Sequence, residues 1–291
     1  MKLSKSFIGL VTVSTIFMLY ASGLYKNLQS DSALEIVDFS IAKPASEKNI
    51  PSNPDRVPLY GDLHVHTKYS FDAYIFGVTA TPYDAYKYAI GEAIKHPLGF
   101  DMKLKEPLDF YAVTDHGFYM GMIENYADTS SEMSKNEWTK PMHNLNRPEN
   151  VTVESLGARA NLFSSVLTQA IIKPYPYWHP KVWKAWLTNN IQVALQSFDY
   201  DVHKSAWADV ANAAEEFNDP GKFTTFIGYE FTTSTDVEGG NLHRNVIFNS
   251  SDAPIRPWTR IDSINPEDLW TWMDGLRDQG LDSLAMPHNS N

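Results

Sequence analysis

Short apolar runs that end in polar residues recur along the chain from residue 57 onward, and stretches of helical periodicity separate them. The apolar runs predict five strands, over residues 59–65, 109–114, 223–232, 242–248 and 282–287. Thr-Pro and Asn-Pro pairs are typical helix starts, and they predict helices over about residues 81–94 and 265–280. Strands that alternate with helices are typical of an α/β layer or barrel, so an α/β domain is expected over residues 57–291.

A long helical stretch interrupts this alternation between residues 120 and 221. The loop between a strand and a helix in an α/β unit normally takes only a few residues, so the stretch is interpreted as a large helical insertion. Four tryptophans lie in its second half, at positions 178, 183, 186 and 207. Two roles are open: a helical layer packed on the flank of the domain, or a cap that supplies aromatic walls to a site.

The N-terminus carries an uncharged apolar run over residues 7–24, which follows Lys2 and Lys5. Small residues at 21–23 suit signal peptidase, so residues 1–23 are predicted to be a cleaved signal peptide. The run is long for a signal, so an uncleaved membrane anchor is the main alternative, and a buried core helix is a third. With a signal or an anchor the chain is exported, to the periplasm or the cell exterior, and meets a membrane only through this segment. Residues 24–56 are polar and proline-interrupted, and are interpreted as a linker.

Composition excludes several classes of function. With 43% hydrophobic and 13% aromatic residues, the chain of 291 residues can build a sizeable core. Its formal charge of −11 repels phosphate backbones, which argues against general nucleic-acid binding. The chain has no cysteine, so disulfides, thiolate metal sites and cysteine nucleophiles are excluded. Any metal must therefore be held by nitrogen and oxygen ligands.

Imidazoles and carboxylates stand at or just beyond one end of each predicted strand. The first strand ends in His64 and His66, which share one face because side chains alternate along a strand, and which can therefore chelate one ion. The other candidates are Asp72 in the following loop, His116, Glu230, His243 and His288. Parallel strands would place these ends on the same side of the sheet, so the side chains are expected to converge in one pocket. The set is too large for one tetrahedral ion and fits a cluster of two or three ions.

Other polar residues near the strands are left out of the predicted site. Arg244 directly follows His243, so strand alternation predicts that its side chain points to the opposite face. The four remaining histidines, His96, His143, His179 and His203, lie away from the strand ends. An isolated histidine lacks the partners that make a site, so these four are expected at the surface or in packing.

The sequence motifs around these residues resemble a known superfamily. The H-x-H strand, Thr114-Asp115-His116, Glu230, His243 and Pro287-His288-Asn289 follow the order of the motifs of the PHP (polymerase and histidinol phosphatase) superfamily. The flanking segments 59–62, 70–74, 76–77, 81–82 and 107–110 are similar to the family catalogued as domain of unknown function 3604. The resemblance runs from about Tyr60 to Asn291, and the helical insertion is its loosest part.

The PHP resemblance implies a distorted (β/α)7 barrel with metal ions at the carboxyl ends of its strands. The resemblance implies three ions. His64 and His66 would bind the first, and Glu230 would bridge it to a second ion that His243 and His288 complete. Asp72 and His116 would hold the third. Many PHP proteins have histidine in place of Asp72, so the affinity for the third ion is open. PHP proteins also close the site with an Asp-x-His motif, for which no residues remain after His288. The barrel is therefore expected to be incomplete at its C-terminus, in a truncated chain.

The resemblance and the ligand set together imply a metal-dependent hydrolase that acts on a small-molecule phosphate ester. A hydroxide bridging two divalent ions, Zn, Mn or Fe, would perform the attack, so no protein nucleophile is needed. Asp115 is the expected catalytic side chain, since it can orient a ligand imidazole. An amidohydrolase-like metal hydrolase of a non-phosphate bond is one alternative, although no strand end carries the lysine such barrels use. A non-catalytic exported metal-binding fragment is the other, and the sequence indicates no oligomeric state.

Overall fold

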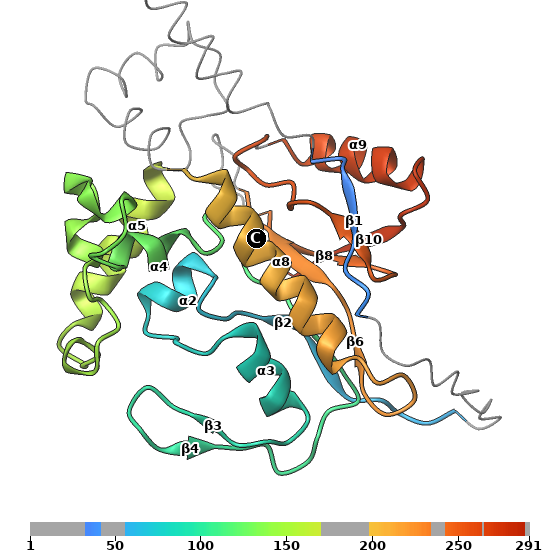
Figure 1. Cartoon of the computed structure of the whole chain (residues 1–291), viewed down its shortest axis with the longest axis horizontal. Helices are drawn as coiled ribbons and strands as arrows, with labels where there is room; N and C mark the ends of the chain where they lie inside the picture. The colour runs from blue at the N-terminus through green and yellow to red at the C-terminus, as the bar shows by residue number, and fades with distance from the viewer. Residues whose placement is uncertain (1–32, 42–55, 170–197, 234–241, 264, 289–291) are drawn as a thin grey trace, which may run out of the picture. The chain divides into compact units, whose positions relative to one another are not determined.

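The computed structural model describes residues 33–41, 56–169, 198–233, 242–263 and 265–288 (Figure 1). The predicted signal or anchor over residues 1–23, most of the predicted linker, Trp178, Trp183, Trp186 and His179 lie outside the described residues. By its internal contacts the chain divides into Met1–Ala33 and Leu34–Asn291, and all described helices and strands belong to the second unit. None of these described helices is long and apolar enough to span a membrane.

The described elements are short strands and helices, as expected for an α/β domain, but several strands follow one another before α4 and before α9. The strands are β1 Ile36–Asp38, β2 Gly61–Val65, β3 Ile94–Lys95, β4 Asp101–Met102, β5 Phe110–Val113, β6 Thr224–Thr225, β7 Gly228–Phe231, β8 Arg244–Phe248, β9 Asp252–Pro254 and β10 Ser283–Pro287. The helices are α2 Phe71–Ile75, α3 Pro82–Ala89, α4 Met122–Ala127, α5 Leu156–Gln169, α8 Tyr200–Phe217 and α9 Pro266–Arg277, with 3₁₀ turns η1 Met133–Lys135, η2 Glu137–Met142 and η3 Pro148–Asn150.

The five predicted strands all form, and strands that follow one another in the sequence lie side by side in space. β2, β5 and β6 pair in parallel, whereas β7, β8 and β10 pair antiparallel. The third predicted strand is split into β6 and β7, and it connects the two sheets: Phe226 N donates to Tyr111 O at 3.1 Å, and Glu230 N donates to Asp115 O at 3.0 Å. The mixed α/β class is confirmed, but the described strands form an open arrangement of small sheets and no closed barrel.

The expectation that all five strands run parallel is wrong for β8, which pairs antiparallel with both β7 and β10. The connection from β7 to β8 covers residues 232–243, which is at the short limit for a parallel crossover. Antiparallel pairing places the start of β8 beside the ends of its two neighbours, because Arg244 is paired with both Phe231 and Pro287. His243, which precedes β8, therefore still lies at the same edge as the residues that end β7 and β10.

Both predicted helix starts are present, but one predicted helix is shorter than expected. Thr81 and Asp84 form a capping box at the start of α3, and the side chain of Asn265 caps α9. α3 ends at Ala89 rather than near residue 94, because the chain turns at Gly91, whose φ of 83° lies in the left-handed region. The strand β3 then begins at Ile94, the residue at which the predicted helix was expected to end.

The described part of the second half of the predicted insertion, residues 198–221, builds core rather than a wall of a site. α8 packs on α3 and on β5 and β6 (Figure 1). Trp207 on α8 is fully buried, its Nε1 donates to the Pro254 carbonyl at 2.6 Å, and its ring packs against Tyr229 of β7. Burial of a tryptophan with its N–H satisfied is a packing role. Trp207 therefore stabilises the sheet on which the strand ends are displayed.

The first half of the insertion packs beside the strand ends. α4, η2 and α5 contribute to a buried aromatic cluster with Phe71 of α2 and Phe118, which follows β5. Arg159 of α5 is buried and donates to backbone carbonyls of Ile75, Leu145 and Asn150 at 2.6 to 2.9 Å. The bond to Ile75 holds the insertion against α2, the helix that carries Asp72, and the other two bonds lie within the insertion.

The described surface includes part of the predicted linker. β1 lies within the predicted linker and pairs antiparallel with β9, from Ile36 opposite Pro254 to Asp38 opposite Asp252.

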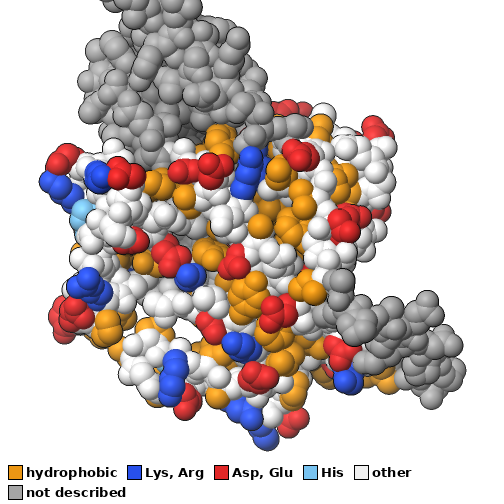
Figure 2. Space-filling view, viewed as in Figure 1, with side chains coloured by type: hydrophobic (Ala, Val, Ile, Leu, Met, Phe, Trp, Pro, Cys, Tyr) orange, Lys and Arg blue, Asp and Glu red, His pale blue; other side chains and the backbone are white. Residues whose placement is uncertain are grey.

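On the face shown in Figure 2, acidic and basic side chains of the described residues are interspersed rather than gathered by sign.

Candidate metal centre

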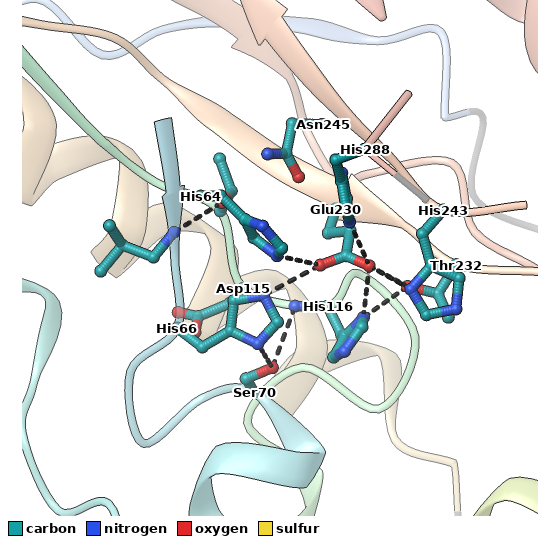
Figure 3. A network of polar contacts seen from close by, with 12 residues as sticks. His64, His66, Ser70, Asp115, His116, Glu230, Thr232, His243, Asn245 and His288 are labelled. Atoms are coloured by element: carbon teal, nitrogen blue, oxygen red, sulfur yellow. Dashed lines mark hydrogen bonds and ion pairs between the residues drawn. The ribbon is translucent and has the colours of Figure 1, made fainter. Parts of the chain in front are cut away.

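Glu230, near the end of β7, lies at the centre of a group of imidazoles (Figure 3). Its side chain is fully buried. Its Oε2 lies 3.2 Å from Nε2 of His64 and 2.9 Å from Nε2 of His66. His64 is on β2 and His66 directly follows it, so the two imidazoles reach the same oxygen from one face of the strand, as the alternation predicts.

The other oxygen of the same carboxylate faces a second group of histidines. Oε1 of Glu230 lies 2.5 Å from Nδ1 of His243, 3.3 Å from Nδ1 of His116 and 3.4 Å from Nε2 of His288. Thr232 donates its hydroxyl to the same oxygen at 3.2 Å and also bonds to His116. One carboxylate is thus shared between imidazoles that come from β2 on one side and from β5, β8 and β10 on the other.

Asp72 completes a ring of alternating carboxylates and imidazoles. Its Oδ1 lies 3.3 Å from Nδ1 of His66, and its Oδ2 lies 3.4 Å from Nε2 of His116. Because both imidazoles also contact Glu230 through their other nitrogens, the four side chains form a closed circuit. Ser70, which directly precedes α2, supports the circuit, since its hydroxyl donates to Asp72 at 2.7 Å and accepts from the backbone N–H of His116 at 3.2 Å.

The two carboxylates are ionised, and they hold a proton on His66. Burial alone would lower the pKa of His66, but its contacts with Asp72 and Glu230 outweigh burial and raise that pKa to about 10. Burial raises the pKa of both carboxyl groups, and hydrogen bonds from the imidazoles outweigh this effect and hold both pKa values far below the usual range. His116 is fully buried, which lowers its pKa in spite of Asp72.

The backbone at the end of β5 brings His116 against β7. Gly117 N donates to the carbonyl of Glu230 at 2.9 Å, and Glu230 N donates to the carbonyl of Asp115 at 3.0 Å. A Cβ on Gly117 would lie 2.8 Å from the ring of Tyr229, which is closer than packed carbon atoms approach. Only glycine therefore lets the chain pass so close to β7 directly after the imidazole.

These side chains could hold metal ions. Their ligand atoms lie within 4.8 Å of one another in three overlapping groups: His64, His66 and Glu230; His66, Asp72 and His116; and His116, Glu230 and His243. A buried anionic carboxylate is stabilised by a cation, and nitrogen and oxygen ligands suit zinc, manganese or iron. All seven predicted ligands are in the cluster, since His288 also contacts Glu230.

Asp115 does not contact the imidazoles as predicted. It is fully buried, and its carboxylate accepts the backbone N–H of Thr67 at 2.5 Å and the Thr67 hydroxyl at 2.6 Å. Among the described residues, no imidazole hydrogen-bonds to it. Burial raises the pKa of Asp115 to about 6, although the bonds from Thr67 partly offset this effect. Its observed contacts fix the backbone that follows His66, so it positions the loop rather than a ring.

Three polar side chains of the site were missed by the sequence reasoning: Ser70, Thr232 and Asn245. Strand alternation could have found two of them, because Thr232 lies two residues after Glu230 and Asn245 lies two residues after His243. Asn245 is paired with Glu230 in register, so both side chains are on the same face of the sheet. Ser70 lies in the loop between β2 and α2, where no periodic signal exists.

The described residues that were left out of the predicted site lie away from it or serve the core. His203 is fully buried, its Nε2 contacts the Gly117 carbonyl at 2.7 Å, and burial lowers its pKa to about 4 despite this bond. His96 stacks on an aromatic ring beside the hairpin β3–β4, and Nε2 of His143 contacts a backbone carbonyl at 2.9 Å. Arg244 stacks over a tryptophan ring of α9, on the side opposite the cluster, as strand alternation predicts.

The fold and the site together define a mixed α/β protein with a histidine–carboxylate cluster that could bind metal ions. Residues 53–291 match the family described as protein of unknown function DUF3604, so the chain belongs to that family. This confirms the part of the sequence resemblance that concerns domain of unknown function 3604, and membership of the PHP superfamily stays a prediction. No curated protein and no solved structure matches the chain.

Proposed function

We propose that this protein is a metal-dependent hydrolase of small-molecule phosphate esters, with a site of the PHP type. The observation that carries the proposal is the buried carboxylate of Glu230, whose two oxygens face two different groups of imidazoles. A carboxylate shared in this way suits two neighbouring cations that each have their own histidines. Such a pair of cations is typical of enzymes that hydrolyse phosphate esters.

The ligand atoms divide naturally among the proposed ions. His64 and His66 with Oε2 of Glu230 would hold one, His243 and His288 with Oε1 a second, and Asp72 with His116 a third. When bound, divalent ions at these positions lower the pKa of a water molecule and neutralise negative charge on a phosphoryl group. The third position has the fewest protein ligands, so we propose that it has the weakest affinity.

The chain's own polar side chains hold this arrangement and do not offer a nucleophile. The hydroxyl of Ser70 is engaged by Asp72 and by the backbone of His116, and Thr232 is engaged by Glu230. These contacts fix the rotation of the two carboxylates before an ion binds. Preorganised ligands reduce the free energy that binding must spend on ordering side chains.

The arrangement of the strands supports a partial barrel of the PHP type. The rings of His64 and His288, from the first and last of the five strands, have centroids 4.0 Å apart. Asn245 of β8 donates to the carbonyl of Leu63 of β2 at 2.7 Å, although β5 and β7 lie between the two strands in the sheet order. Contacts across the sheet order require strong curvature, which a barrel-like arrangement supplies.

The proposal is tested on the full chain with p-nitrophenyl phosphate, with p-nitrophenyl acetate as the probe for non-phosphate ester hydrolysis. The protein is stripped with a chelator and reloaded with zinc, manganese or iron(II). We expect phosphate hydrolysis that depends on the added metal and is lost in the double variant His64→Ala/His66→Ala. The matched control is His143→Ala, which removes an imidazole that bonds only outside the cluster and should retain activity.

Three results would contradict the proposal, each in a different way. Hydrolysis of the acetate ester alone would favour an amidohydrolase-like reaction. Bound metal without turnover of either probe would favour a non-catalytic metal-binding protein. Activity that survives the loss of both His64 and His66 would show that the cluster is not the site. The proposed location of the reaction outside the cytoplasm is tested separately, by fractionation of cells that express the full chain.

A further inference from the structure

Asn245 is a buried amide whose orientation is fixed by only one of its two polar atoms. It lies on β8, is 3% exposed, and its Nδ2 donates to the carbonyl of Leu63 at 2.7 Å. A carbonyl oxygen can only accept, so the amide atom that faces it must be the NH₂ group. Among the described residues, no group hydrogen-bonds to the remaining Oδ1. A buried acceptor of this kind requires a donor, because an unmade hydrogen bond costs free energy.

His288 has the complementary requirement. Its Nε2 lies 3.4 Å from Oε1 of Glu230, whereas its Nδ1 is buried and has no hydrogen-bond partner among the described residues. A neutral imidazole that binds a cation through Nε2 carries its proton on Nδ1. Histidines that bind metal almost always donate this second N–H to an acceptor, which fixes the ring and its tautomer.

The register of the sheet makes the two residues neighbours on one face, although Oδ1 of Asn245 and Nδ1 of His288 are not hydrogen-bonded to each other in this structure. Asn245 is paired with Met286 of β10, and His288 is two residues beyond Met286, so Asn245 and His288 share one face on a diagonal. Diagonal neighbours have Cβ atoms at most about 7–8 Å apart, a span that two inclined side chains can close. Figure 3 shows both side chains on the same side of Glu230.

We propose that Asn245 is the positioning residue of His288: its Oδ1 accepts the Nδ1 proton, so that Nε2 is presented as the ligand. The inference rests on the proposed function in so far as it concerns a metal ligand. The same amide would also connect two strands that are far apart in the sequence. The chain of bonds from the Leu63 carbonyl through Asn245 to His288 connects β2, which carries the first ligands, to the end of β10, which carries the last.

The test uses ring ¹⁵N NMR of the histidines in the full chain at about pH 8, with His288 assigned from the signals lost in His288→Gln. In the zinc-loaded protein we expect a slowly exchanging Nδ1 proton on His288. Asn245→Leu should speed that exchange and weaken zinc binding about 10- to 100-fold, as loss of a ligand's outer partner does. In metal-free protein the same variant should lower the fraction of the Nδ1–H tautomer, because Glu230 then draws the proton to Nε2.

Two further variants separate positioning from structure. Asn245→Asp keeps an acceptor for His288 and should retain the protected Nδ1 proton. Thr114→Val removes the other side-chain donor to the Leu63 carbonyl, at 3.3 Å, and should cost stability without changing the tautomer of His288. An unchanged Nδ1 proton and an unchanged zinc affinity in folded Asn245→Leu would overturn the inference. Wild-type protein that binds no zinc would overturn the proposed function instead, and the metal-free tautomer measurement would still decide the role of Asn245.

Discussion

The proton on His66 makes a quantitative prediction about how the site takes up metal. In the metal-free protein the pKa of His66 is raised to about 10 by its carboxylate partners, so the imidazole is protonated at neutral pH. A metal ligand must be deprotonated, so an ion bound through His66 displaces this proton. At pH 7, about three pH units below that pKa, the displacement costs about 4 kcal/mol. Binding should therefore strengthen about tenfold for each pH unit gained until the pKa is reached.

The assay is isothermal titration calorimetry of the chelator-treated chain with zinc, in buffers of different ionisation enthalpy between about pH 6.5 and 8.5. The dependence of the observed enthalpy on the buffer gives the number of protons released per ion. We expect at least one proton from His66, and one fewer in His66→Ala, where Glu230 and His243 still offer ligands. His96→Ala is the control, because its ring stacks outside the cluster, and its proton count should equal that of the wild type.

Equal proton release in the wild type and in His66→Ala would refute a proton on His66. Zinc binding at full stoichiometry with an affinity that does not change with pH would refute it as well. Either result would mean that the imidazole is already neutral before the ion arrives, and that the two carboxylates do not hold a proton between them.

Three shorter predictions concern the same region. Glu230→Gln removes the shared carboxylate and should lower the metal content by at least one ion per chain, as measured by elemental mass spectrometry after dialysis. Thr67→Val removes a hydroxyl donor from the buried carboxylate of Asp115, so urea unfolding should show a loss of about 2 kcal/mol. His203 is buried and neutral, and its pKa of about 4 is below the unfolded value, so its stabilising contribution is complete above about pH 6.5 and is lost as the pH falls toward 4. The free energy of unfolding, measured with urea at about pH 7 and pH 4, should therefore differ less between the two pH values in His203→Gln than in the wild type, by up to about 3 kcal/mol.

The α/β class and the composition of the cluster could be predicted because both depend on local pattern. His64 and His66 share a face by alternation alone, and Glu230 ends an apolar strand where a lone carboxylate needs a cation. Helix starts at Thr81 and Asn265 follow from capping chemistry within a few residues. None of these inferences needs knowledge of which strands become neighbours.

Features that depend on tertiary placement could not be predicted. The direction of β8 is set by its partners. The ligands still converge, although β8 was predicted to run the other way, because His243 lies before its strand rather than after it. The partner of Asp115 is Thr67, a contact that depends on how the loop after β2 passes the end of β5. Ser70 lies in a loop without a periodic signal, and the contact of Asn245 with Leu63 of β2 depends on the curvature of the sheet.

The histidines of β2 and of the end of β10 meet at the carboxylate of Glu230, and this has a consequence for the lifetime of the protein. His64 and His288 are 224 residues apart in the sequence (288 minus 64), yet their rings are 4.0 Å apart. Ions held from both sides of Glu230 would act as a cross-link that closes a very long loop, and such links disfavour the unfolded chain. A ligand at a thousandfold excess over its dissociation constant stabilises the folded state by about 4 kcal/mol. Metal scarcity would therefore leave more chains open to proteases, and it would reduce the number of surviving molecules as well as the turnover of each.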